Sequence, residues 1–436
     1  MIAVTERGSE ERLVRAIGFP TLTANIINLT IGAGIFVMPA IVAGGLGAAA
    51  PLAYVVCASL MGLIVACFAA AGSRVSMTGG LYAYIEVAFG PFVGFVAGVL
   101  YWLTAAFAVA SVASAFAGSV GALVPALAGS IGRATLIALV FVALAALNVR
   151  GVRWGAHVVQ LATAAKLLPL AIFVATGIWF VNGGALRWPG LPSTETLGRT
   201  CIILIYAFAG VELALMPTGE VREPSRTVPR AVFTALAATT TFYLLIQTVA
   251  QGLLGASLTT YSAAPLAEAA SRVLGGTGRT LILLGATVSM FGYMSGDMLG
   301  SPRTLYAFAR DGMLPAAVAR VHDRFRTPHV AIVLHAAIVG LLAASSSFTQ
   351  LAILANVAVL SLYLIGVTAA FELQRRDVRS GGAPFRLPGG ATVPVLAALV
   401  IVWLLSHATA REFGVEASVI ALAAGLYFMR KGVGQT

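Results

Sequence analysis

Charged side chains are scarce in this chain. Asp, Glu, Lys and Arg make up only 10% of its 436 residues, whereas 59% are hydrophobic. An ordinary soluble domain has roughly 25% charged residues, so the composition excludes a protein whose main solvent is water. The apolar residues suffice for about a dozen spans of roughly 20 residues each, which also excludes a single-span receptor. We expect an all-α membrane protein, in which the 47 glycines let helices approach closely.

Cysteine is almost absent, and its three copies lie inside apolar runs: Cys57, Cys67 and Cys201. They lack metal-ligand spacing, so neither a disulfide framework nor a zinc site is expected. The five histidines show no ligand pairing either, and we expect no metal and no cofactor. No GxxxxGK[ST] motif occurs, which excludes ATP drive within this chain.

A secretory signal is also missing. Residues 1–17 carry charges but no short apolar core followed by a small-residue cleavage site, and they are expected to be a cytoplasmic tail. The net charge of +11 comes from short basic clusters between apolar runs rather than from a basic stripe. Membrane topology explains this pattern better than a nucleic-acid partner does.

Hydropathy predicts twelve spans, at residues 18–43, 47–71, 91–124, 132–148, 155–181, 196–219, 229–255, 277–307, 328–346, 349–373, 391–408 and 415–430. Twenty of the 27 Arg and Lys residues then fall on the side of the N-terminal tail, and six fall on the other side. The positive-inside rule therefore predicts that both termini lie in the cytoplasm. We expect the protein in the plasma (inner) membrane. Residues 74–90 are too polar to span and favour an interfacial helix.

Two predicted spans contain glycines near mid-depth. Gly32 and Gly34 interrupt span one, and Gly210 stands near the ionisable Glu212 in span six. Such glycines can mark either a close helix crossing, as with Gly94 in span three, or a broken helix that lines a cavity. Interruptions at corresponding positions of two halves indicate an inverted repeat with a central substrate site. Freed N–H groups attract a carboxylate and freed carbonyls attract an ammonium, and an amino acid carries both groups.

Five segments together carry a family resemblance. They are Gly32-Ala33-Gly34-Ile35-Phe36, TGGLYAYIEVAFGPFVGF from Thr78, AFAGVE from Ala207, GEVREPSRTVPRA from Gly219 and SPRTLYAFARDGMLP from Ser301. Because these segments occur in this order and at this spacing, the chain resembles amino acid permeases of the amino acid-polyamine-organocation (APC) superfamily. The resemblance implies a LeuT-type five-plus-five inverted repeat, with residues 18–181 and 196–373 as the repeats and residues 391–430 as two accessory helices.

The resemblance also implies a substrate site at the two breaks. The substrate carboxylate would meet the N–H groups of Ala33, Gly34 and Ile35. Its ammonium would meet backbone carbonyls of Thr30 or Ile31 in span one and of Tyr206 and Ala209 in span six, and Gly210 would belong to the same site. The Tyr206 ring would serve either as a gate over the pocket or as a packing aromatic.

Three ionisable residues lie deep in predicted spans: Lys166, Glu212 and Asp297. A charge at mid-bilayer is costly, so each should be paired, neutralised or functional. Similar proton-coupled transporters carry a lysine where Lys166 stands, which favours proton coupling over a structural cation. Glu212 would brace the break in span six or sense protonation. Asp297 would bind a cationic substrate end, pair with Lys166, or join a polar cluster with Ser289 and Ser295.

The sequence therefore predicts a secondary active permease that moves amino acids by alternating access, with protons as the coupling ion and the lipid bilayer as its surroundings. An exchanger of cationic amino acids or polyamines is the alternative. An intramembrane enzyme would need a nucleophile with a base or a metal at one depth, and a channel would need a continuous polar lining. The sequence favours neither.

Overall fold

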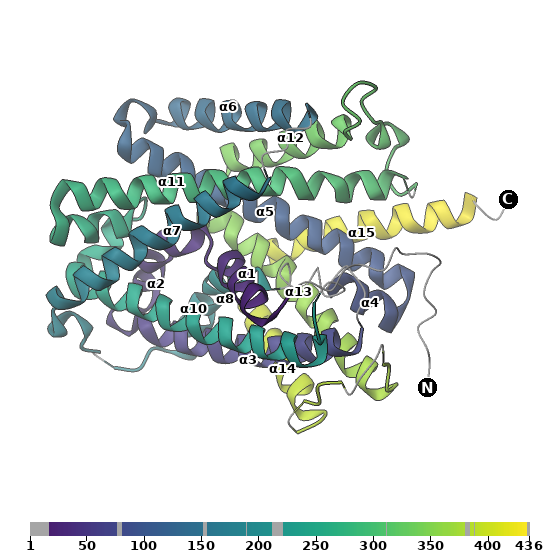
Figure 1. Ribbon diagram of the computed structural model, residues 1–436, viewed down its shortest axis with the longest axis horizontal. Coiled ribbons are helices and arrows are strands. Elements are labelled where there is room, and N and C mark those ends of the chain that lie inside the picture. The colour runs from purple at the N-terminus through teal and green to yellow at the C-terminus, as the bar shows by residue number, and fades with distance from the viewer. Residues whose placement is uncertain are drawn as a thin grey trace.

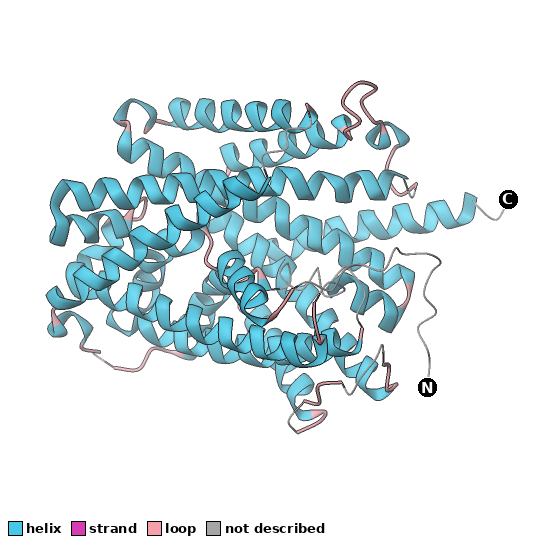
Figure 2. Ribbon diagram, in the orientation of Figure 1, coloured by secondary structure: helices cyan, strands magenta, loops and turns pink. Residues whose placement is uncertain are grey.

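The computed structural model describes residues 17–75, 81–150, 155–188, 190–211, 221–310, 312–379, 384–387 and 389–433. Within these ranges the chain is helical, with one isolated bridge between Ile17 and Val221 and no strand (Figure 2). This confirms the expected all-α class.

Fourteen α-helices occupy most of these ranges (Figure 1). They are α1 (Phe19–Thr30), α2 (Met38–Leu46), α3 (Ala50–Arg74), α4 (Leu81–Phe89), α5 (Pro91–Leu123), α6 (Ser130–Val149), α7 (Gly155–Gly177), α8 (Thr194–Phe208), α10 (Pro224–Leu254), α11 (Pro265–Arg310), α12 (His329–Ser345), α13 (Phe348–Arg375), α14 (Thr392–Leu405) and α15 (Ala410–Val433). Several begin with proline in the first turn, where the missing N–H costs no helical hydrogen bond.

Seven helical stretches in the described ranges are long and apolar enough to cross a bilayer, and three further apolar helices are shorter. The number twelve therefore stays a prediction. Predicted spans five, nine and eleven correspond to the three shorter helices, and the second half of predicted span one, α2, is counted together with α3 in the stretch Met38–Arg74. Where the stretches can be compared, as for α5, α6 and α13, their bounds lie within a few residues of the hydropathy prediction.

The first predicted span is broken at its glycines. α1 ends at Thr30, a short 3₁₀ turn (η1) occupies Ala33–Phe36, and α2 begins at Met38. The interruption predicted near Gly32 and Gly34 is therefore confirmed.

The sixth predicted span is broken at a matching place. α8 ends at Phe208, Ala209 is extended, and Gly210 has φ of +117°, a region that side-chain-bearing residues rarely adopt. A Cβ on Gly210 would lie 2.8 Å from the carbonyl oxygen of Leu29 in α1. The two breaks therefore face each other at backbone-to-backbone distance, as predicted.

The broken helices lie inside a shell of long helices. α1 appears near the middle of Figure 1 and packs on α10, which in turn packs on α3. α13 packs on both α5 and α3, and α11 packs on α5 and α7. α6 and α12 lie side by side along one edge of the molecule (Figure 1).

The polar connection after α13 is attached to α3. The buried Arg74 guanidinium lies 3.4 Å from the Asp377 carboxylate, and Ser73 accepts a hydrogen bond from the Phe385 N–H at 3.0 Å. Hydrogen bonds from Arg379 and then Arg74 hold the pKa of Asp377 below its ordinary value. The connection between α13 and α14 is thus anchored to α3.

The crossing of α3, α4 and α13 provides a test of this packing. A Cβ on Gly366 would lie 2.4 Å from Leu81 Cδ1 and 3.1 Å from the Phe68 ring. Gly366→Val should therefore lower stability by about 2 kcal/mol through overpacking, measured as a lower thermal unfolding midpoint in detergent. Gly425→Val is the matched control, since a Cβ there meets no atom within 4 Å. Equal midpoints for the two variants would contradict the tight crossing.

Candidate substrate cavity

A cavity of about 480 Å³ lies where the two helix breaks meet. Its walls come from the α1 break, from α5, α7 and α8, and from α11 and α13. Along α11 the lining extends from Ser289 to Thr304, about 22 Å at 1.5 Å per residue. The cavity therefore runs from the breaks toward the end of α11 at Arg310.

Most residues that the sequence singled out line this cavity: Thr30, Gly34, Lys166, Tyr206, Ala209, Gly210 and Asp297. Ile31 and Ile35 are buried and do not appear in its wall, although Ile35 belongs to the η1 turn beside it. Ala33 contributes its backbone to the same turn. Glu212 lies outside the described residues.

Lys166 links α7 to the end of α1. Its side chain is 8% exposed, and its ammonium donates a hydrogen bond to the main-chain carbonyl of Asn28. That carbonyl lies in the last turn of α1, just before the break, where helical carbonyls lack intrahelical partners. A cation therefore stabilises the C-terminal end of α1 while also lining the cavity.

A buried tyrosine joins the two breaks. The Tyr243 hydroxyl lies 3.0 Å from the carbonyl oxygen of Thr30 and 2.8 Å from that of Ala207, so its single hydrogen can be donated to either break. The Thr30 carbonyl also accepts a hydrogen bond from the Gly32 N–H at 2.8 Å. In this conformation, the Gly32 N–H bonds to the Thr30 carbonyl and the Tyr243 hydroxyl lies within reach of it, although the sequence predicted this carbonyl as a partner of a substrate ammonium.

Tyr206 lines the cavity and bridges α5 and the start of α13. Its hydroxyl lies 2.5 Å from that of Ser111 and donates to the Ala108 carbonyl at 3.1 Å, both on α5. Its ring packs edge-on against Phe348 at the start of α13, with ring centroids 5.5 Å apart. A Cβ on Gly34 would lie 2.9 Å from the Tyr206 ring, so glycine is required for this approach.

Asn356 is a cavity residue that the sequence analysis missed. It is 1% exposed, and its amide donates to the carbonyls of Ile202 and Ile203 in α8 at 2.7 and 3.1 Å. Its Oδ1 has no hydrogen-bond partner among the described residues. An asparagine inside an apolar span is a signal that could have been read, because a polar group buried there needs partners.

The three pairings considered for Asp297 did not include the observed ones. Its Oδ2 lies 2.8 Å from His335 Nε2 and its Oδ1 accepts a hydrogen bond of 2.5 Å from Ser301. Ser301 could have been found, since residues four apart share one face of a helix. His335 could not, because the sequence does not reveal which part of α12 faces α11.

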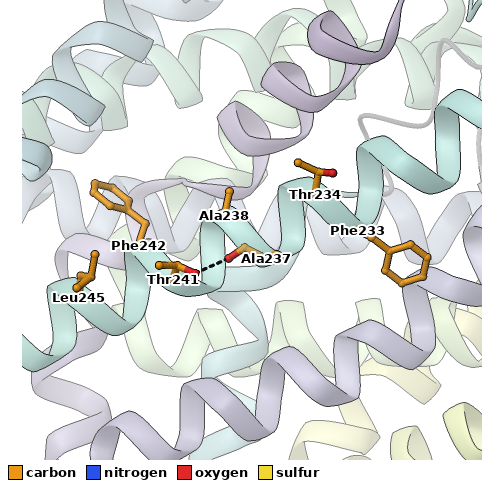
Figure 3. Close-up of a pocket in the computed structure, with 7 residues that line it drawn as sticks. All are labelled: Phe233, Thr234, Ala237, Ala238, Thr241, Phe242 and Leu245. Atoms are coloured by element: carbon orange, nitrogen blue, oxygen red, sulfur yellow. Dashed lines mark hydrogen bonds between the residues drawn. The ribbon is translucent and has the colours of Figure 1, made fainter.

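A second hollow lies on the surface of α10 and does not compete as a substrate site. Figure 3 shows all of its lining residues on that single helix: Phe233, Thr234, Ala237, Ala238, Thr241, Phe242 and Leu245. The Thr241 hydroxyl donates a hydrogen bond of 2.9 Å to the carbonyl of Ala237. A one-helix surface of this kind provides no converging polar groups.

Comparisons with known proteins agree with this architecture. The family model for amino acid permeases matches residues 17–424. The serine/threonine exchanger SteT of Bacillus subtilis is 28% identical over 397 residues, covering 88% of this chain and 89% of the relative. An uncharacterised transporter of Mycobacterium tuberculosis is 31% identical over 435 residues, covering 98% and 93%. The methylthioribose transporter of B. subtilis is 25% identical over 423 residues, covering 92% and 90%.

The matched segment includes both breaks and every helix that lines the cavity. The chain therefore belongs to the amino acid permease family of the APC superfamily and is a membrane transporter rather than an enzyme.

Proposed function

We propose that this protein is a secondary transporter of amino acids that works by alternating access in the plasma membrane, with both termini in the cytoplasm. In this proposal twelve spans form two inverted repeats, residues 18–181 and 196–373. Residues 1–17 form a cytoplasmic tail and residues 391–430 form two accessory helices. The family match and the amino acid named for one relative support an amino acid as the substrate.

The observation that carries the proposal is the pair of opposed helix breaks at the cavity. Broken helices inside a membrane present N–H and C=O groups that a ligand can satisfy. The N–H groups of the η1 turn, at Ala33, Gly34 and Ile35, would bind the substrate carboxylate. Carbonyls of Ile31, Tyr206 and Ala209 would bind the ammonium, since the Thr30 carbonyl already has partners.

The contacts of Tyr206 support a role as the outer gate. They connect α8 to α5 and to the start of α13 at the breaks, while the lining of α11 continues toward Arg310. The charge distribution predicts that Arg310 lies on the cytoplasmic side. The described conformation therefore corresponds to an inward-facing state, and opening outward would require Tyr206 to separate from Ser111 and Phe348.

Coupling to protons is the second part of the proposal, with Lys166 and Glu212 as the candidate groups. Lys166 supports it by geometry, because its ammonium bonds to the end of α1 and lines the cavity at the same time. Loss of its proton would weaken the bond to Asn28 and free α1 to move. Symport and exchange both remain compatible with this arrangement.

The substrate site can be tested by filling the gap between the breaks. Gly34→Val should abolish binding and uptake of radiolabelled amino acids in proteoliposomes, because its side chain would enter the space of the Tyr206 ring. The panel would begin with serine and threonine. Gly44→Val is the control, since a Cβ at that α2 glycine meets no atom within 4 Å. A folded Gly34→Val protein with normal uptake would overturn the site.

The coupling role can be tested by removing the amine. Lys166→Ala should abolish the pH dependence of uptake and leave pH-independent exchange in counterflow assays. Lys166→Arg should also lose pH dependence, because a guanidinium keeps its proton at any physiological pH. Uptake by Lys166→Ala that still follows an imposed pH gradient would reduce Lys166 to a structural cation.

A further inference from the structure

Asp297 differs from the other polar residues that line the cavity because its side chain is acidic. Its side chain is 7% exposed and lines the cavity, whereas His335, bonded to it from α12, is fully buried. Among the described lining residues Asp297 is the only acid and Lys166 the only base. The other titratable lining residues are Tyr101 on α5, Tyr206 on α8 and Tyr293 on α11.

The partners of His335 indicate its charge. Its Nε2 faces the carboxylate, and its Nδ1 has no hydrogen-bond partner among the described residues. A protonated imidazole would carry a buried N–H at Nδ1 with no acceptor, which is costly. Trp102 packs edge-on against the ring, with centroids 6.1 Å apart. The favoured form is therefore neutral, with the hydrogen on Nε2 donated to Asp297.

Two neutral donors then hold a negative charge at the cavity wall. His335 donates to Oδ2 of Asp297 and Ser301 donates to Oδ1. Hydrogen bonds to the ionised form favour a charged carboxylate, and neither donor cancels its charge. An apolar substrate side chain placed against Asp297 would take that carboxylate out of water without compensation, whereas a cationic side chain would neutralise it.

We propose that Asp297, with His335 as its positioning residue, forms a subsite for a cationic substrate side chain, an ammonium or a guanidinium. The subsite rests on the proposed function, because the two helix breaks would bind the α-carboxylate and the α-ammonium of the same substrate.

The subsite is tested with three ligands that share the amino acid backbone. Arginine carries a guanidinium, citrulline is its neutral isostere, and leucine is apolar. Purified wild-type protein should bind arginine at least tenfold more tightly than citrulline. Asp297→Asn should weaken arginine binding by about a hundredfold, as expected when one member of a buried charge pair is removed, and should leave leucine binding within about twofold.

The role of His335 is tested by two replacements. His335→Leu removes the N–H donor and should raise the KM for arginine about tenfold, the typical effect of a hydrogen bond to a charged group, without a matching change in kcat. His335→Gln keeps a donor that cannot become charged and should restore much of the wild-type KM. Thr287→Val is the control on α11, because among the described residues the Thr287 hydroxyl bonds only to the Leu283 carbonyl, and Thr287 does not line the cavity.

The outcomes separate the inference from the proposed function. If wild-type protein binds only neutral amino acids, the cationic subsite is wrong while the amino acid transporter stands. If it binds no amino acid, the proposed function itself fails. If His335→Gln and His335→Leu raise the KM for arginine and for leucine equally, His335 has only a structural role and its positioning role is overturned.

Discussion

Unpaired backbone groups inside a membrane are the constraint on which this structure depends. A helix can end within the hydrocarbon only where protein, water or a ligand satisfies its free N–H and C=O groups. Here two helices end at facing positions, after Thr30 and after Phe208, and the surrounding residues supply part of what those ends need. The Tyr243 hydroxyl lies within hydrogen-bond distance of a carbonyl on each broken segment, and Lys166 donates to the last turn of α1. In the proposed function, a substrate would satisfy further groups at the two breaks.

The same constraint relates substrate binding to movement. Tyr206 and Asn356 connect α8 to α5 and α13, and Lys166 connects α7 to α1. These contacts are hydrogen bonds to a backbone carbonyl or a hydroxyl, and Tyr206 adds one edge-on ring contact with Phe348. Hydrogen bonds of this kind can be exchanged for others without exposing apolar surface, which suits the movement that the proposed alternating access requires.

The sequence predicted the parts of this site that depend on local chemistry. Glycines weaken a helix, and their occurrence at corresponding positions of two predicted spans indicated the breaks near Gly34 and Gly210 from the amino-acid sequence alone. The break at Gly34 also changes the span count, because the second half of the first predicted span, α2, is counted with α3 in the stretch Met38–Arg74. Contacts between distant elements could not be predicted in this way. The pairing of Asp297 with His335 depends on the rotation of α12 against α11, and the role of Tyr243 depends on the close approach of three helices.

The position of a bound amino acid is the most direct test of the proposed substrate site. A structure of the purified protein determined by cryo-electron microscopy with a saturating amino acid substrate would test it. The account predicts ligand density between the η1 turn and the segment from Tyr206 to Gly210, with the carboxylate at the N–H groups of η1. Density for the amino acid elsewhere, with the two breaks unoccupied, would contradict the account.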